Sequence, residues 1–197
     1  MKQLALALIA FASIALGIWF GLQNQPPSSK QDPYANIGGD FTLESTKGPV
    51  SLHDFKGKVV VLYFGYTRCP DVCITALSKV SLALKSMSDA ERAQVQPIFV
   101  SIDPERDTPA VAGGYVAYFY PGAIGLSGTP EQIAKVAKRY LVIYEKVKLK
   151  DSAMGYSMDH SSIIYVIGRD GKISALVHHV DTAEALVKAV RDALAAP

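Results

Sequence analysis

Two cysteines separated by three residues are the side chains of this 197-residue chain best suited to chemistry. Cys69 and Cys73 follow an apolar run that predicts a strand, and the segment after them has helical periodicity. In a helix, positions i and i+4 share a face about 6 Å apart along the axis, so two thiolates there can converge on one metal ion. A helix N-terminus also lowers the pKa of a cysteine. We therefore expect both thiols to ionise readily.

The same pair of cysteines has two other interpretations. Cys69 and Cys73 could be small buried hydrophobes or form a structural disulfide, but a bridge that closes so short a loop stabilises little. They could also be a redox pair. Thioredoxin-like oxidoreductases, however, usually have two residues between their cysteines at this turn, whereas this chain has three. The spacing favours metal binding and leaves a redox pair as the main rival.

His160 is the third candidate ligand. It lies just before a predicted strand, which we expect beside the strand that leads to Cys69, and loops that enter strands commonly present side chains to a site. Two soft thiolates and one imidazole suit copper, whereas zinc more often has a fourth protein ligand or a catalytic water. The residue types therefore predict a copper site formed by Cys69, Cys73 and His160, with Asp159 able to orient the imidazole.

Two other groups of residues are weaker candidates for a functional site. His178 and His179 end a predicted strand, where adjacent side chains point to opposite faces and cannot easily serve one ion. The charged loop 103–109 follows another predicted strand, at the kind of sheet edge where α/β sites lie. This loop is either a solvated connection or a segment that supports the site or docks a partner.

Alternating strands and helices must position these residues. We predict strands at 58–66, 96–102, 124–126, 142–149, 161–167 and 172–177, helices at 71–87, 109–120, 130–139 and 182–195, and an N-terminal hairpin pairing 41–43 with 50–52. Parallel strands early, an antiparallel hairpin late and helices between them are the element order of a thioredoxin-like domain. The predicted fold class is α/β, thioredoxin-like, with a central mixed sheet and an N-terminal β-hairpin.

The N-terminal segment predicts a transmembrane anchor in residues 1–23. Residues 4–22 carry no charge and would span about 28 Å as a helix, longer than the apolar core of a cleaved signal. Cleavage after Ala12 is the less favoured alternative. Residues 24–37 predict a flexible tether, and residues 38–197 a thioredoxin-like copper-binding domain. Lys2 favours a cytoplasmic N-terminus, so we expect a single span in the inner (cytoplasmic) membrane with the domain on the periplasmic side.

The charge pattern bears on the choice of partner. The formal charge of +2 comes from Lys2 and Lys30, and the remaining chain has equal numbers of basic and acidic residues. A balanced domain without clusters of Lys and Arg lacks the basic surface that binds phosphate backbones. We therefore expect no nucleic-acid partner.

The motifs together resemble the Sco/SenC family, copper chaperones involved in assembling the binuclear copper site of cytochrome c oxidase. The resemblance covers nearly all of residues 38–180 and rests on the runs Gly39–Leu43, Phe64–Cys73, Val100–Thr108, Gly128–Ile133 and Asp159–Ser161. It implies that Cys69, Cys73 and His160 bind copper, as Cu(I) or Cu(II), and that the chain has a membrane anchor and a thioredoxin fold. The implied partners are the copper-site subunit of the oxidase and other copper chaperones or thiol oxidoreductases.

The chain departs from the family pattern at two positions beside the cysteines. Ile74 stands where many relatives have proline, and Arg68 stands where histidine is frequent. Neither departure removes a ligand. Arg68 adds a positive charge that favours thiolates but not a bound cation. These departures therefore bear on metal affinity and leave the identity of the site unchanged.

Three functions fit the residues. The leading hypothesis is a metallochaperone that passes copper to the oxidase by ligand exchange. The alternative is a thiol:disulfide oxidoreductase in which Cys69 and Cys73 are redox-active and reduce cysteines of a membrane oxidase subunit. A peroxide-reducing thioredoxin relative ranks last, because it needs a dedicated activating pocket around one cysteine. Replacing His160 separates the first two, since only the metallochaperone needs its imidazole.

Overall fold

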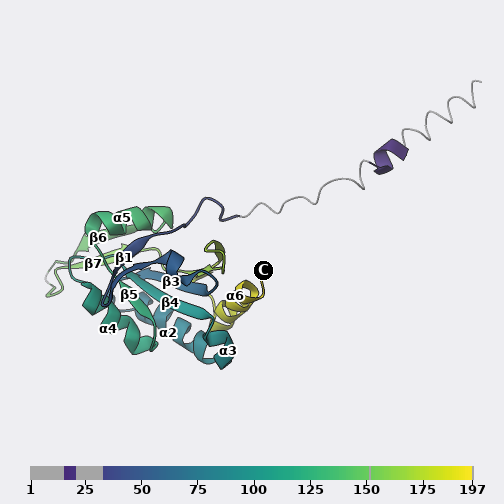
Figure 1. Ribbon diagram of the computed structural model, residues 1–197. Helices are drawn as coiled ribbons and strands as arrows, with labels where there is room; N and C mark the ends of the chain where they lie inside the picture. The colour runs from purple at the N-terminus through teal and green to yellow at the C-terminus, as the bar shows by residue number, and fades with distance from the viewer. Residues whose placement is uncertain (1–15, 21–32, 151, 197) are drawn as a thin grey trace, which may run out of the picture. The chain divides into compact units, whose positions relative to one another are not determined.

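The computed structural model describes residues 16–20, 33–150 and 152–196 (Figure 1). The chain divides into two units, Met1–Pro33 and Tyr34–Pro197. In the first unit, residues 16–20 are helical and exposed. Among the described residues, no helix has the length and apolar character needed to span a membrane. Most of the predicted anchor, residues 1–15 and 21–23, and residues 24–32 of the predicted tether lie outside the described part of the chain.

A mixed five-stranded sheet forms the centre of the second unit, as the sequence predicts. Its strands stand in the order β5 (Ile124–Leu126), β4 (Val95–Ser101), β3 (Val59–Gly65), β8 (Ile163–Ile167) and β9 (Ile173–His178). The first three run parallel, whereas β8 is antiparallel to both β3 and β9. All seven residues of β3 are buried, which explains why its sequence is an almost unbroken apolar run. The expected pairing of β3 with the strand after His160 is confirmed.

Helices lie on both sides of this sheet (Figure 1). They are α2 (Val72–Lys85), α3 (Asp89–Arg92), α4 (Pro109–Phe119), α5 (Pro130–Arg139) and α6 (Ala183–Ala195). Side chains of β3 alternate between the two faces: Tyr63 lies near Leu77 of α2, whereas the ring of Phe64 packs at a tilt against Tyr140 at the end of α5. The short helix α3 and the 3-10 helix η1 (Leu52–Phe55) were not predicted from the sequence.

Local sequence explains where two of these helices begin. Thr108 and Thr129 each precede a proline in the first helical turn, and each hydroxyl accepts a hydrogen bond from the backbone N–H three residues further on. Such a residue satisfies one of the free N–H groups at a helix start, and proline at that position lacks an N–H that would go unpaired. Both starts agree with the prediction.

Two smaller antiparallel sheets complete the unit. The predicted N-terminal hairpin is present as β1 (Thr42–Ser45) and β2 (Gly48–Ser51). The other sheet pairs β6 (Tyr144–Lys148) with β7 (Tyr156–His160), and Tyr144 lies opposite His160. The expectation that His160 lies in a loop is therefore wrong, since it is the last residue of a strand. Polar β7 gives little strand signal of its own, and its extended form comes from pairing with β6 and from burial of Met158.

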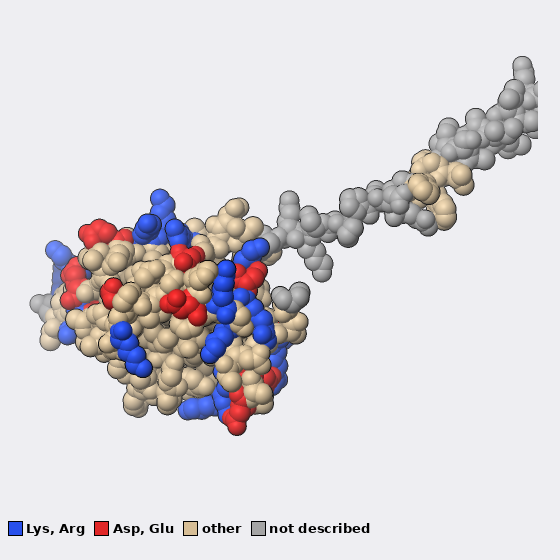
Figure 2. All heavy atoms as spheres, in the orientation of Figure 1, with Lys and Arg blue, Asp and Glu red and all other residues tan. Residues whose placement is uncertain are grey.

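Charged side chains of both signs are interspersed on the face of the second unit seen in Figure 2. Five ion pairs are found within the described residues. One of them, between Arg106 and Asp103, has both side chains almost fully buried. This buried pair lies in the loop after β4, the charged loop that the sequence analysis left open between solvation and support of the site.

Candidate metal centre

The two cysteines lie where β3 passes into α2. Cys73 is in the first turn of α2, whereas Cys69 lies in the turn before it, so the helical i, i+4 spacing describes their separation only in part. The backbone N–H of Cys73 nevertheless donates to Sγ of Cys69 at 3.4 Å. Both cysteines are free thiols, with Cys69 6% exposed and Cys73 0% exposed. The turn thus holds two sulfur atoms side by side at the edge of the core.

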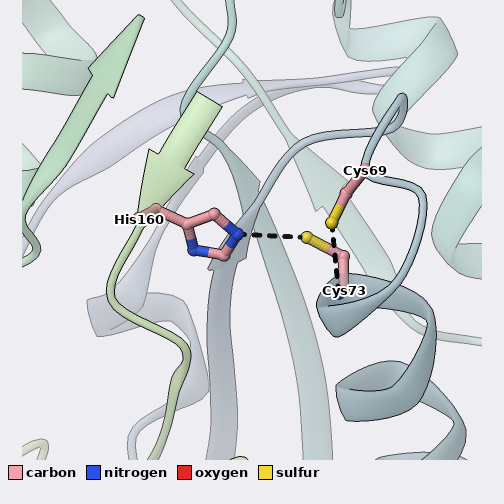
Figure 3. Close-up of side chains that lie close together, drawn as sticks. All are labelled: Cys69, Cys73 and His160. Carbon is pink, nitrogen blue, oxygen red and sulfur yellow. Dashed lines mark hydrogen bonds between the residues drawn. The ribbon is translucent and has the colours of Figure 1, made fainter. Parts of the chain in front are cut away.

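His160 reaches the same point from β7 (Figure 3). Its Nε2 lies 3.3 Å from Sγ of Cys73, and its Nδ1 lies 3.1 Å from the carbonyl oxygen of Ser161. A carbonyl oxygen only accepts, so Nδ1–H donates to it, and Nε2 is the ring nitrogen that faces the sulfur atoms and could bind a metal. Asp159, the residue predicted to orient the imidazole, is exposed, and the orienting acceptor is the backbone of Ser161 instead.

The three side chains together have the dimensions of a metal site. Their ligand atoms all lie within 4.8 Å of one another, and this is the only group of its kind in the described part of the chain. Ligand atoms around one ion, with bonds of about 2.0 to 2.3 Å, stand roughly 3.5 to 4 Å apart. Small side-chain rotations would therefore bring Cys69, Cys73 and His160 onto one ion. His178 and His179 do not belong to the group.

Gly65, the last residue of β3, makes room for Cys73. A Cβ at position 65 would lie 2.8 Å from Sγ of Cys73 and 2.9 Å from the ring of Tyr63. Its backbone φ is not positive, so glycine is needed here for space and not for conformation. The rings of Tyr63 and Tyr66 pack edge-on against the imidazole of His160, with centroids 6.3 and 5.9 Å away. Packing on these neighbours limits the orientations that the ligands can adopt.

The two thiols differ in their acidity. Hydrogen bonding from Cys73, followed by bonds from His160 and from backbone N–H groups, lowers the pKa of Cys69 to about 4 despite its burial. The same contact with Cys69 and its own deeper burial raise the pKa of Cys73 well above its ordinary value. The expectation that both thiols ionise readily therefore holds for Cys69 alone. In the metal-free protein, Cys69 is therefore the thiolate of the pair and accepts a hydrogen bond from the Cys73 thiol.

A buried carboxylate holds the turn before Cys69. Asp107, in the loop after β4, is 1% exposed and accepts hydrogen bonds from the backbone N–H of Thr67 at 2.8 Å and from its hydroxyl at 2.6 Å. Ser101 donates to the same carboxylate at 2.6 Å. The charged loop thus supports the site. Residue types and spacing did not identify Gly65, Thr67 or Asp107 as site residues, although the position of the charged loop at the end of a strand was consistent with support of a site.

The protein is a thioredoxin-like α/β domain with a Cys-Cys-His group at the end of its central strand. These features define a class of thioredoxin relatives whose site can hold a soft metal ion. Comparison with known sequences narrows the class. The SCO1/SenC family model matches residues 29–195. The chain belongs to the SCO1/SenC family.

Individual relatives agree with this assignment. The bovine (Bos taurus) "Protein SCO2 homolog, mitochondrial" is 36% identical over 189 residues, which cover 91% of this chain and 71% of the relative. Among eight such relatives, the matched segment spans between 48% and 74% of the relative's length.

Solved structures give the same picture. Arabidopsis thaliana ScoI with copper bound is 36% identical with a TM-score of 0.73, covering 79% of this chain and 99% of that one. Bradyrhizobium japonicum ScoI with copper bound is 42% identical with a TM-score of 0.71, covering 80% and 99%. BsSco, described as having a disulfide switch and as a member of the Sco family of cytochrome c oxidase assembly proteins, is 25% identical with a TM-score of 0.65, covering 84% and 98%.

Proposed function

We propose that this protein is a copper metallochaperone that binds one copper ion through Cys69, Cys73 and His160. The observation that carries the proposal is the convergence of these three ligand atoms within 4.8 Å. Two thiolates and an imidazole are a donor set that favours copper in either of its common oxidation states. Structures of two relatives, from Arabidopsis and Bradyrhizobium, were solved with copper bound, which supports the same metal here.

The recipient that we propose is the binuclear copper site of cytochrome c oxidase. The description of BsSco as belonging to a family of cytochrome c oxidase assembly proteins supports this recipient. Copper would pass by ligand exchange, in which an incoming thiolate takes the place of one thiolate of this protein and the metal keeps its oxidation state. Cys69 is the more exposed of the two cysteines and lies in a turn, whereas Cys73 is fixed in α2 and fully buried. Exchange would therefore begin at Cys69 or His160 and end at Cys73.

The membrane arrangement is a further part of the proposal. Its support is the uncharged apolar sequence of residues 4–22 and the polar, proline-containing segment that follows. Residues 1–23 would anchor the chain in the inner membrane, residues 24–37 would form a tether, and residues 38–197 would carry the metal on the periplasmic side. A tethered domain would remain close to a membrane-embedded oxidase, which raises its effective concentration there.

A thiol:disulfide oxidoreductase is the second candidate, and one observation favours it. Cys69 is a thiolate at neutral pH, and a thiolate is the form that attacks a disulfide. In such a reaction Cys69 would form a mixed disulfide with the partner, and Cys73 would then displace the partner's reduced thiol and leave a Cys69–Cys73 disulfide. His160 forms no covalent bond in these steps, and it contributes only by helping to lower the pKa of Cys69. The approach of its Nε2 to Cys73 therefore favours metal binding as the main function.

An anaerobic copper titration of the detergent-solubilised full chain tests the proposal. We expect one copper ion per chain in the wild type, at least tenfold weaker binding in His160→Ala, and loss of the site in Cys69→Ser/Cys73→Ser. A tenfold change corresponds to about 1.4 kcal/mol of binding free energy. A wild type that binds copper no more tightly than the double serine variant refutes the metallochaperone. Disulfide exchange that persists in His160→Ala, without copper binding in any variant, supports the oxidoreductase.

A further inference from the structure

Arg106 contacts the strand that carries His160. Its side chain, 11% exposed, pairs with the carboxylate of Asp103, which is itself 2% exposed. The guanidinium donates to the carbonyl oxygens of Met154 at 3.3 Å and Tyr156 at 3.0 Å. It also stacks on the ring of Tyr156, 3.6 Å from the centroid. Ion pairing, hydrogen bonding and stacking thus hold the beginning of β7 against the loop after β4.

Asp103 completes this arrangement from the other side. Its second carboxylate oxygen accepts a hydrogen bond from the hydroxyl of Tyr156 at 2.7 Å, and its backbone N–H donates to Ser101 at 3.1 Å. The ring of Tyr156 is therefore held at its hydroxyl by Asp103 and on its face by Arg106. A buried arginine stacked on an aromatic ring and paired with a carboxylate is a rigid combination, because the planar guanidinium makes all these contacts in one orientation.

Arg106 also lies beside the ring against which His160 packs. The guanidinium carbon is 5.9 Å from the centroid of Tyr66, whose ring is edge-on to the imidazole of His160, with the two centroids also 5.9 Å apart. The carbonyl oxygen of Tyr66 accepts a hydrogen bond from the backbone N–H of Cys69 at 3.3 Å. One arginine thus contacts both β7 and Tyr66, which link the histidine to the cysteine turn.

The sheet that carries His160 depends on such contacts. Strands β6 and β7 form a two-stranded sheet that is not hydrogen-bonded to the central five strands. A two-stranded hairpin is marginally stable in water by itself, so its position is set by what anchors it. We propose that Arg106 is a positioning residue that keeps the imidazole of His160 in reach of the two cysteines, so that all three side chains can contact one copper ion. The metal-binding part of this inference rests on the proposed function.

Lys146 provides a matched control. It lies on β6 of the same hairpin, pairs with Glu105 of the same loop at 2.7 Å, and stands 4.3 Å from the centroid of Tyr156. Both partners of this ion pair are exposed, however, and exposed pairs contribute little. Replacing Lys146 therefore removes a positive charge and a contact between the same two segments without removing the buried anchor.

A double-mutant cycle in copper affinity tests the inference on the full chain. We expect Arg106→Gln to weaken copper binding about tenfold, within the range for residues that orient a metal ligand. In the His160→Ala background the same change should have less than a twofold effect, because no imidazole remains to be positioned. Arg106→Lys should keep only part of the affinity, since lysine cannot stack or donate to two carbonyls in a fixed plane. Lys146→Gln should bind copper as the wild type does.

An equal loss in both backgrounds, or no loss in either Arg106 variant, overturns the inference. Nuclear Overhauser contacts between the rings of His160 and Tyr66 provide a metal-free measurement. These contacts should be present in the wild type and in Lys146→Gln, and they should be lost in Arg106→Gln. If Arg106→Gln does not fold, they should be weakened in Arg106→Lys. Unchanged contacts also overturn it. If the wild type fails to bind copper but the ring contacts change among the variants as expected, the proposed function is refuted and the positioning role of Arg106 is retained.

Discussion

Gly65→Ala is a small change with a large expected effect on the metal centre. The added Cβ would meet Sγ of Cys73 at 2.8 Å, the ring of Tyr63 at 2.9 Å and the ring of Phe99 at 3.2 Å. Non-bonded carbon and sulfur atoms normally approach to about 3.5 to 4 Å. The three neighbours are at most 1% exposed, so none can move into solvent. Cys73 or the strand itself must therefore shift by roughly 1 Å.

The cost can be worked out from packing. Inserting one methyl group into a well-packed core costs about 1 to 3 kcal/mol, and the lower backbone entropy of unfolded alanine returns about 0.4 to 1 kcal/mol. We expect a net loss of about 1 to 2 kcal/mol in the free energy of unfolding. For a domain of this size, that loss lowers Tm by about 2 to 8 °C. Displacement of Cys73 should also weaken copper binding by about tenfold.

Gly114→Ala is the matched control for this experiment. Gly114 lies within α4, and a Cβ there meets nothing within 4 Å. Alanine favours a helix by about 1 kcal/mol over glycine, so this variant should be more stable than the wild type and bind copper unchanged. Thermal unfolding of the metal-free proteins and anaerobic copper competition titrations measure both effects. Wild-type stability and affinity in Gly65→Ala would refute the assignment of Gly65 as the residue that makes room for Cys73.

Three further predictions follow from the site and its surroundings. In the metal-free protein, alkylation of Cys69 should proceed at a nearly constant rate between about pH 5 and 8, because its pKa of about 4 keeps it a thiolate, and mass spectrometry should find Cys73 unmodified. A rate that falls tenfold for each unit by which the pH is lowered, as for an ordinary thiol, would contradict this. Asp107→Asn should lower the free energy of unfolding in urea by about 1 to 3 kcal/mol, because both carboxylate oxygens accept hydrogen bonds and an amide NH2 in place of one of them cannot accept. Unchanged stability would argue against the buried carboxylate as an anchor. Thr129→Ala should cost about 1 kcal/mol through loss of the α5 cap and leave copper affinity unchanged, and a parallel loss of affinity would show that α5 is coupled to the site.

Strong local signals made most of the fold predictable. The apolar run of β3, the Thr-Pro helix starts and the turn between β8 and β9 each indicate one structure regardless of their surroundings. Strand β7 could not be found in this way. Its residues from Tyr156 to His160 are mostly polar, and their extended form depends on β6 and on a distant loop. Its prediction needed contacts that separate segments make only in the folded chain.

The site was predictable in its residue types but not in its chemistry. The spacing of Cys69 and Cys73 and the motif around His160 identified all three members of the group that the structure brings together. The unequal acidity of the two thiols follows from the hydrogen bond between them and from the deeper burial of Cys73, and neither can be read from the sequence. The burial of Asp107 could not be predicted either, since aspartate is usually exposed and its partner Thr67 is forty residues away in the sequence.

The coordination of the bound metal tests the central claim most directly. X-ray absorption at the copper edge of the loaded full chain should give two sulfur ligands at about 2.3 Å and one imidazole nitrogen at about 2.0 Å, by analogy with other soft-metal sites. The imidazole contribution should disappear in His160→Ala while both sulfurs remain. An imidazole signal that survives in His160→Ala, or a wild-type site without sulfur, would contradict a copper centre built from Cys69, Cys73 and His160.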